Sequence, residues 1–263
     1  MTTKIFAGIL FVLMILSAGL PAGAENGGYE TLPVKAVLFP IREATLSTMI
    51  DGVIAKCNYR AGERFRKGDV LFTIDDRRYR NELNRADSQI REAALGVKFA
   101  KQKKEDNERL YKNDLQSELE VEKSRFDYEV ALERQQAARV SRDYAALLLQ
   151  FCVIKAPFNG TVEKLLTREF EMVRSGQPVL SIIDDDQLLA VLNLPSVSIP
   201  KMKIGLPLTI RITENGKTVT GSVYEIASRA DHRSETFEIK VRIDNSHHEF
   251  KAGMSGILVK IGE

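Results

Sequence analysis

The sequence contains two copies of one pattern, on either side of an unrelated stretch. Residues 45–76 align with residues 153–184 without a gap, at a constant offset of 108 positions (160 − 52). This repeat constrains the fold strongly, because repeated segments fold as equivalent units. One copy is too short to enclose a hydrophobic core, so we expect both copies to close one core across a pseudo-twofold axis. The matched pairs are Leu46 with Ile154, Gly52 with Gly160, Ile54 with Val162, Arg66 with Arg174, Gly68 with Gly176, Ile74 with Ile182 and Asp76 with Asp184.

Each copy reads as short β-strands separated by turns that carry glycine. The turns fall at Gly52 and Gly68 in the first copy and at Gly160 and Gly176 in the second. The strands that follow these turns are predicted at Val53–Tyr59, Val70–Ile74, Thr161–Leu166 and Val179–Ile183.

The stretch between the copies changes to a helical pattern. From about Asp76 to Gln150 there is no proline and only one glycine, Gly96, while strong helix formers predominate. Apolar or small residues recur in alternating steps of four and three, as in a heptad seam. We predict that the seam runs through Tyr79, Leu83, Ala86, Ile90, Ala93, Val97 and Ala100 in the first half. In the second half it is predicted to run through Phe126, Val130, Ala137, Val140, Tyr144 and Leu147, interrupted by Glu133.

A polar break at residues 112–117 divides this stretch into two helices. Asn113 is expected to end the first, and Ser117 with Glu120 forms a capping box that starts the second. The pattern predicts two antiparallel helices of roughly 33 residues, an arm roughly 50 Å long at ~1.5 Å per residue. Two helices cannot bury all their apolar surface, so we expect the arm to pack against copies of itself or a partner. An ordinary helical domain is the alternative.

Residues 1–24 read as a secretory signal peptide. The basic start Met1–Lys4 precedes an apolar run at Ile5–Leu20, and Ala22 and Ala24 satisfy the small-residue rule for cleavage. The run is shorter than the ~20 residues that a membrane-spanning helix needs. We expect the mature chain to begin near Glu25 outside the cytoplasm, with an uncleaved N-terminal anchor as the alternative.

Composition excludes several function classes. The chain of 263 residues has a formal net charge of +2, whereas nucleic-acid-binding domains show a clear basic excess. Two Cys and three His are too few for zinc-ribbon or cysteine-rich scaffolds. The sequence has no G-x-S-x-G, H-E-x-x-H, P-loop or dinucleotide motif. We predict a non-enzymatic protein without cofactor, metal or nucleic acid, and interpret Asp184–Asp186 as a solvated linker and His247-His248 as a solvated turn.

These features together resemble the periplasmic adaptor, or membrane fusion protein, family of tripartite efflux pumps. The resemblance rests on Asp51–Ile54, on Arg64–Leu71 and most specifically on Ile154–Val162, which reads I-x-A-P-F-x-G-x-V. It covers Val34–Gly262. It implies a mainly β fold, in which a biotinyl/lipoyl-like flattened barrel is split by a long antiparallel coiled-coil α-helical hairpin and followed by a small C-terminal β-barrel domain.

The family pattern divides the mature chain into five parts. They are an N-terminal strand segment joining the β-barrel (25–43), lipoyl-like half 1 (44–75), the helical hairpin (76–150), lipoyl-like half 2 (151–186) and the β-barrel domain (187–263). Strands of the last part are predicted at Leu188–Leu194, Pro207–Ile212, Val219–Ile226, Phe237–Asp244 and Ile257–Ile261. The membrane-proximal domain that the family commonly builds from both termini is expected to be absent.

The resemblance implies an adaptor in the periplasm that links an inner-membrane RND-type exporter to an outer-membrane channel for efflux of small molecules. Association of this adaptor with the inner membrane is the alternative to a freely exported protein. A homo-oligomer of three or six copies would line a sealed conduit, with energy from the exporter. We favour an RND-type partner because type I secretion adaptors usually have a cytoplasmic N-terminus, a transmembrane helix and a longer hairpin. The alternatives are an adaptor for an ABC-type exporter and a periplasmic cargo- or metal-binding module on the same fold.

In the family the hairpin tip engages the outer-membrane channel through an R-L pair followed, after six residues, by S. Arg109, Leu110 and Ser117 match this motif. The resemblance implies that Leu110 supplies an apolar knob, Arg109 a fork of donors, and Ser117 an N-cap with a contact hydrogen bond. In the alternative interpretation Arg109 is solvated, Leu110 packs within the hairpin and Ser117 only caps its helix.

Cys57 and Cys152 lie one in each lipoyl-like half, Cys57 in half 1 and Cys152 in half 2. An oxidising compartment permits a disulfide between them if their Cα atoms lie within about 7 Å, and two buried thiols are the alternative. A biotin or lipoyl carrier would need a lysine at a tight turn between the halves. The helical stretch replaces that turn, so neither group is expected.

Overall fold

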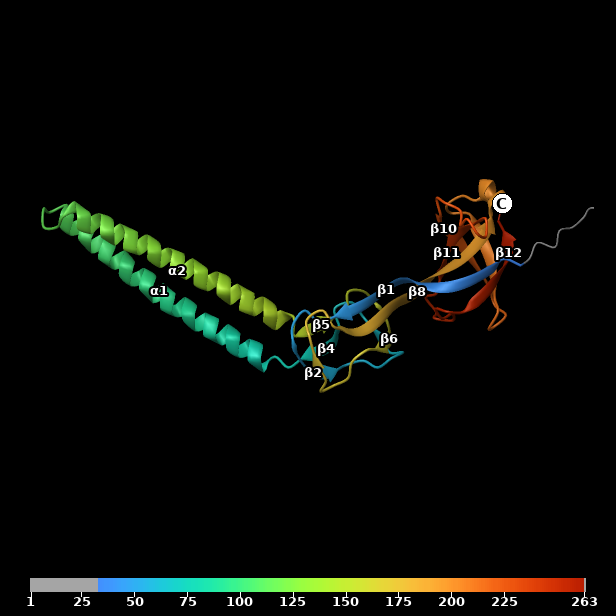
Figure 1. The fold of residues 1–263 in the computed structure, drawn as a ribbon, viewed down its shortest axis with the longest axis horizontal. Coiled ribbons are helices and arrows are strands. Elements are labelled where there is room, and N and C mark those ends of the chain that lie inside the picture. Colours follow the sequence, from blue (N-terminus) through green and yellow to red (C-terminus); the bar gives the residue numbers. More distant parts are fainter. Residues whose placement is uncertain (1–32, 263) are drawn as a thin grey trace, which may run out of the picture. The chain divides into compact units, whose positions relative to one another are not determined.

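The computed structural model describes residues 33–262. The predicted signal peptide at residues 1–24 lies outside the described residues. Within the described part of the chain, neither long helix has an apolar stretch sufficient to cross a lipid bilayer. Figure 1 labels the main helices and strands and colours them by their position in the sequence.

The C-terminal strands form a closed β-barrel with the first strand of the fold. Hydrogen-bonded neighbours follow the order β1, β12, β9, β10, β11, β8, and β8 pairs again with β1. The barrel core contains Leu38, Ile210 and Val241, all fully buried. The bounds are β1 Lys35–Ser47, β8 Pro178–Pro195, β9 Pro207–Ile212, β10 Thr218–Ile226, β11 Thr236–Asp244 and β12 Ser255–Ile261, with a 3-10 helix at Ser196–Lys201.

The two repeat copies form the second β unit. Its strands are β2 Gly52–Cys57, β3 Arg64–Phe65, β4 Val70–Ile74, β5 Val153–Lys155, β6 Gly160–Leu165 and β7 Met172–Val173. One sheet has the order β5, β4, β2, β7, and the other joins β3 and β6 to β8. Both copies contribute to a single core that includes Ile54, Phe72, Val162 and Ile182. The prediction that two halves close one core is therefore confirmed.

Strand positions and hydrogen bonds repeat at the offset found in the sequence. Strands β6 and β7 start and end 108 positions after β2 and β3, and β8 starts 108 positions after β4. Contacts between the halves are reciprocal, as expected for a pseudo-twofold axis. The backbone N–H of Ile54 donates to the carbonyl of Glu171, and the equivalent N–H of Val162 donates to the carbonyl of Glu63, both at 3.0 Å. In the same way, the N–H of Gly68 donates to the carbonyl of Ala156 at 2.9 Å, and the N–H of Gly176 donates to the carbonyl of Thr48 at 2.8 Å.

Two antiparallel helices interrupt the repeat unit, α1 at Arg77–Tyr111 and α2 at Glu118–Gln150. The predicted seam of α1 is confirmed, because all seven residues from Tyr79 to Ala100 are buried or half-buried. The predicted seam of α2 is wrong, because Phe126, Val140 and Tyr144 are exposed. The inner face of α2 is instead formed by residues with the same heptad steps, namely Val121, Ser124, Tyr128, Ala131, Gln135, Ala138, Arg142, Ala145 and Leu149.

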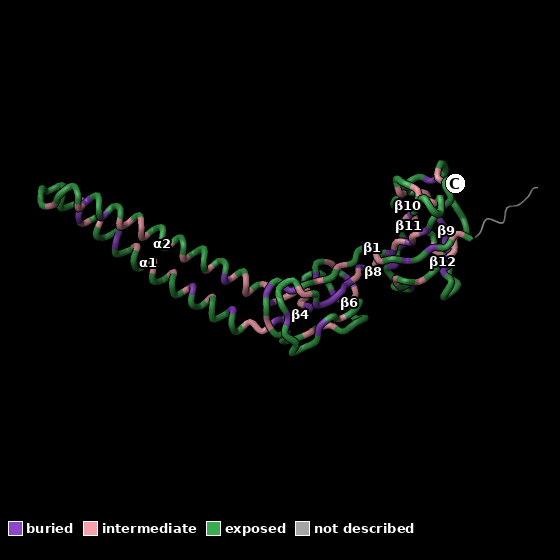
Figure 2. The backbone as a smooth tube through the Cα atoms, in the orientation of Figure 1, coloured by how far each residue is buried: buried purple, intermediate pink, exposed green. Residues whose placement is uncertain are grey.

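The outer face of α2 therefore carries an apolar stripe, defined here as Phe126, Val130, Ala137, Val140, Tyr144 and Leu147. All but Val130 are exposed, and Figure 2 shows how much of the hairpin surface is open to solvent. Small residues on the inner face allow the two helices to approach closely. The larger apolar residues consequently remain outside, where a second helix can pack on them.

Removal of the hairpin is expected to leave the repeat unit folded. The two halves supply all their own strands and exchange hydrogen bonds directly, so a short Gly-Ser turn in place of residues 76–150 should preserve the β signal in circular dichroism and a cooperative melt. A spectrum typical of an unfolded chain would contradict this independence of the halves from the hairpin.

Candidate functional site

The hairpin tip is built by a backbone motif that ends α1 and turns the chain. The N–H of Leu115 donates to the carbonyl of Leu110, and that of Asp114 to Tyr111, both at 3.0 Å. Asp114 has φ +55, the left-handed conformation that such a Schellman ending requires. These bonds satisfy carbonyls that the end of a helix would otherwise leave without partners.

The tip presents apolar side chains to solvent. Leu110 is 38% exposed, Leu115 and Leu119 are each 72% exposed, and Tyr111 lies next to them in sequence with an exposed ring. Leu110 and Tyr111 are partly covered by the described chain, whereas Leu115 and Leu119 are mostly open to solvent. Apolar side chains gathered in this way at the end of a solvated arm are typical of a surface that contacts another protein.

The three predicted tip residues lie at this turn but differ in their surroundings. Arg109 is exposed and forms an ion pair with Asp106 at 2.5 Å, which leaves most of its guanidinium donors open. The Oγ of Ser117 accepts the N–H of Glu120 at 3.4 Å, so the predicted N-cap is present. Its side chain serves the helix start.

Polar pairs hold the two helices together immediately before the tip. Arg125 donates to Glu108 across the hairpin at 2.8 Å, and this bond lowers the pKa of the Glu108 carboxyl. The buried amide of Asn107 donates to the carbonyl of Glu120 at 3.4 Å. These two hydrogen bonds fix the helices relative to each other directly behind the tip residues.

The disulfide candidate pair, Cys57 and Cys152, is not bonded in the structure. Strand β4 lies between them. On one side of β4, Phe72 pairs with Cys57 of β2, and on the other side the backbone N–H of Ile74 donates to the carbonyl of Cys152. Two positions on either side of one strand are separated by about 9–10 Å, beyond the reach of a bridge. Burial raises the pKa of Cys57, and it raises that of Cys152 to about 11.

We expect both thiols to stay reduced in the exported protein. Intact mass spectrometry without reductant should give the mass of the fully reduced chain, and alkylation under native conditions should label Cys57 faster than the buried Cys152. A mass two hydrogens lower would contradict the strand order given above.

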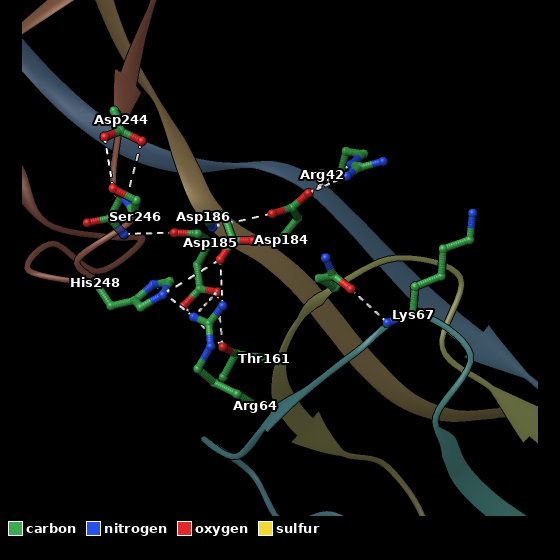
Figure 3. A network of polar contacts seen from close by, with 12 residues as sticks. Arg42, Arg64, Lys67, Thr161, Asp184, Asp185, Asp186, Asp244, Ser246 and His248 are labelled. Atoms are coloured by element: carbon green, nitrogen blue, oxygen red, sulfur yellow. Dashed lines mark hydrogen bonds and ion pairs between the residues drawn. The ribbon is translucent and has the colours of Figure 1, made fainter.

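A polar network at Asp184–Asp186 was missed by the sequence interpretation (Figure 3). Asp184 is only 5% exposed and accepts from Arg42 at 2.5 and 3.0 Å. Arg64 bridges Asp185 at 3.2 Å and Asp186 at 2.5 Å. The predicted solvated linker is therefore wrong for these carboxylates.

His248 joins this network rather than lying in a free turn. Its Nδ1 is 2.8 Å from the guanidinium of Arg64, and Thr161 donates its hydroxyl to Asp185 at 3.0 Å. Asp185, Asp186 and His248 are close enough to hold a cation, but the guanidinium of Arg64 already bridges the two carboxylates and offsets one of their two negative charges. The cluster has the chemistry of an ion-paired structural junction. The repeat does not signal this network, because Asp76, the equivalent of Asp184, pairs instead with Arg80, four residues later in the sequence.

Comparison with known proteins decides the family. The family model described as "RND MFP, barrel-sandwich hybrid domain" matches residues 42–191, which is more than half of the chain. The chain belongs to the RND membrane fusion protein family. A second model, "CusB-like, beta-barrel domain", matches residues 190–259 of this membrane fusion protein.

Solved structures of similar fold include three other proteins. MacA from Actinobacillus actinomycetemcomitans is 18% identical with a TM-score of 0.73, over 88% of this chain and 79% of that one. The membrane fusion protein Spr0693 from Streptococcus pneumoniae R6 is 14% identical with a TM-score of 0.71, over 89% and 99%. ZneB from Cupriavidus metallidurans is 18% identical with a TM-score of 0.58, over 88% and 98%. Because these identities are low, the similarity to the three structures shows only a shared fold.

Proposed function

We propose that this membrane fusion protein is a non-enzymatic periplasmic adaptor that links an inner-membrane RND-type exporter to an outer-membrane channel for the efflux of small molecules. The observation that carries the proposal is the tip of the hairpin. An arm of two helices of 35 and 33 residues ends in exposed apolar side chains around Arg109, Leu110 and Ser117.

Chemically, this tip suits a helical partner. Leu110 and Leu115 offer apolar surface, and the forked guanidinium of Arg109 can bind the free carbonyls at a helix end. Because Ser117 is already used as an N-cap, we assign it the role of setting the turn geometry that presents the other two. We also propose that the Ser117 hydroxyl donates a hydrogen bond to the outer-membrane channel.

The apolar stripe of α2 supports a homo-oligomer, either a trimer or a hexamer. Its heptad spacing suits a neighbouring helix. Charge favours α1 of another copy as that helix, because α1 has ten basic and six acidic residues (net +4) while α2 has five and seven (net −2). Side-by-side hairpins would bury the stripe and leave every tip at the same end, as a conduit requires.

The test is carried out in a strain that lacks the chromosomal gene. Expression of the wild-type chain should restore efflux of the exporter's substrates, and affinity purification after mild cross-linking should recover one RND-type exporter and one outer-membrane channel. Recovery of an ABC-type exporter would correct the partner assignment. Normal efflux in the deletion strain, without either partner in the purified material, would contradict the adaptor role.

A further inference from the structure

One end of the β-barrel is built from three segments that lie far apart in the sequence. Strand β8 starts in the repeat unit, and the 3-10 helix Ser196–Lys201 follows its other end. The N–H of Ser196 donates to the carbonyl of Glu235 at 3.3 Å, and that of Gly262 donates to the carbonyl of Pro207 at 2.8 Å. We name this surface the barrel end and define it as residues 196–206, 227–235 and 259–262. It is the end of the barrel away from the repeat unit.

Large apolar side chains of the barrel end are open to solvent. Val197 is 82% exposed, Ile204 is 74% exposed, and Val259 is 54% exposed. The segment that carries Val197 and Ile204 is nevertheless fixed to the barrel, because Met202 is buried in the core and Ile199 packs against it. The segment therefore holds part of its apolar surface inside the barrel and presents the rest outward.

The opposite end of the barrel does not have this character. This junction end, defined as residues 213–217 and 245–254, faces the repeat unit, and the side-chain amide of Asn245 donates to the carbonyl of Asp185 there at 2.8 Å. Within these two segments no large apolar side chain is exposed, and Lys217 forms an ion pair with Glu249 at 2.8 Å. Exposed apolar surface is thus not a general property of the barrel loops.

The barrel end is also basic. Its three segments carry five basic and two acidic residues (net +3), whereas the junction end carries two of each (net 0). Residues 196–206 include Lys201 and Lys203 and no acidic residue, and both lysines are exposed. Neither is among the ion-paired lysines of the described chain, which are Lys101, Lys103, Lys217 and Lys240.

This combination favours a lipid surface over a protein as the partner. Exposed aliphatic side chains next to lysines suit the interface of a bilayer with anionic headgroups. Protein interfaces are instead enriched in aromatic residues and depleted of lysine. The chain also enters the barrel here, since the N–H of Leu258 donates to the carbonyl of Val34 at 2.9 Å. The residues that follow the predicted signal peptide therefore lead into the barrel end.

We propose that the barrel end binds the surface of a lipid bilayer that carries anionic phospholipids. Val197 and Ile204 enter the boundary between headgroups and acyl chains, and Lys201 and Lys203 lie against the phosphate groups. In the proposed adaptor this bilayer is the inner membrane, and only that choice of membrane rests on the proposed function. Several copies in one assembly would bind the bilayer together, so a weak contact for each copy suffices.

Binding to lipid vesicles tests the proposal on the purified, exported chain. Vesicles of phosphatidylcholine alone are compared in a flotation assay with vesicles that also contain phosphatidylglycerol, an anionic phospholipid. The chain should float with the anionic vesicles and stay in solution with the neutral ones. Because salt screens exposed charges, the bound fraction should fall as the ionic strength rises.

Two double variants separate the barrel end from the charge of the whole chain. Lys201→Gln with Lys203→Gln should weaken vesicle binding about tenfold or more. Lys217→Gln with Lys251→Gln removes the same charge from the junction end and should leave vesicle binding unchanged. All four side chains are exposed, so both variants should keep the melting temperature of the wild-type chain.

Tryptophan fluorescence reports which residues enter the bilayer, because the chain has no tryptophan of its own. Ile204→Trp is paired with Phe170→Trp as its control, since Phe170 is similarly exposed, at 79%, but belongs to the repeat unit. The vesicles contain brominated acyl chains, which quench tryptophan on contact. Emission from position 204 should be quenched, and emission from position 170 should not.

Each outcome decides the proposal. Quenching at position 204 alone, with loss of binding only in the Lys201 and Lys203 variant, supports it. Failure of the wild-type chain to bind anionic vesicles at low ionic strength overturns it, and cross-linking of position 204 to the exporter in cells would then assign the barrel end to a protein. Vesicle binding without stronger quenching at position 204 than at 170, or with equal losses in the two lysine variants, also overturns it.

The vesicle assay is independent of the test of the proposed function. It contains neither exporter nor channel, so a negative result leaves the adaptor role standing. Conversely, normal efflux in the deletion strain would remove the adaptor role and leave the lipid contact standing.

Discussion

Replacement of Leu110 by Asp is expected to abolish efflux while the protein stays folded. Leu110 is partly exposed at the tip, so the substitution should change the free energy of unfolding by about 0.5 kcal/mol or less. In a docked tip the carboxylate would be buried without a partner, at a cost of about 3 kcal/mol or more. Every 1.4 kcal/mol is about tenfold in affinity, so binding to the channel should weaken more than a hundredfold.

The measurement combines substrate efflux, abundance of the chain in the periplasm and cross-linking to the outer-membrane channel. Leu110→Met is the matched control, because it keeps the apolar surface and the volume, and it should retain both efflux and cross-linking. Full efflux and undiminished cross-linking by an abundant Leu110→Asp protein would show that the tip does not dock in the proposed way.

Gly160→Ala is expected to destabilise the repeat unit severely. A Cβ atom at this position would lie 2.1 Å from the carbonyl oxygen of Ile183, on the strand that β6 pairs with. A backbone carbonyl cannot move away by a change of rotamer as a side chain can, so the added Cβ atom would push β6 and β8 apart locally. We expect a loss of about 3 kcal/mol or more, seen as a fall in melting temperature of about 6 °C or more.

The repeat provides the matched control for this substitution. Gly52 is the equivalent of Gly160, but a Cβ atom there would meet the Cγ2 methyl of Ile74 at 2.4 Å. A side-chain methyl can shift by a change of rotamer, so Gly52→Ala should cost about 1–2 kcal/mol. Equal losses for the two variants, measured by thermal denaturation, would contradict the distinction between backbone and side-chain contact.

The β architecture was predictable because its signal is a repeat. A constant offset compares the chain with itself, and neither Gly52 nor its equivalent Gly160 leaves room for a Cβ atom, although the atoms that crowd the two positions differ. Long helices free of proline were equally clear. The predicted C-terminal strands lie within β8 to β12, although β8 starts ten residues earlier, at Pro178.

The inner face of α2 was not predictable from period alone. This helix has two stripes with the same heptad steps, one of small residues such as Ala131 and Ala138 and one of large residues such as Phe126 and Tyr144. Hydrophobicity favours the large stripe, whereas close packing of two helices favours the small one. Which stripe of α2 faces inward depends on where α1 lies in the folded protein, and the sequence of α2 alone does not contain that information.

The tip residues and the ion-paired junction show the same difference between features that depend on neighbours in sequence and features that depend on distant residues. Ser117 was identifiable because capping is local, with its partner three residues away. Arg64 and Asp186 are 122 positions apart, and charge runs in a sequence look alike whether they are solvated or paired. Neither composition nor spacing could indicate that Asp184 is buried beside Arg42.

The pairing of β1 with β8 and β12 has a consequence for biogenesis. The start of β1 finds its partners more than 150 and 220 positions later, as in Ala36 with Leu192 and Lys35 with Ile257. Such high contact order slows folding, and a chain that emerges N-terminus first displays β1 as an unpaired edge until nearly all of it has arrived. We therefore expect the half-made protein to depend on chaperones that shield exposed strand edges, and a deficit of these chaperones should reduce its yield before that of proteins with mainly local contacts.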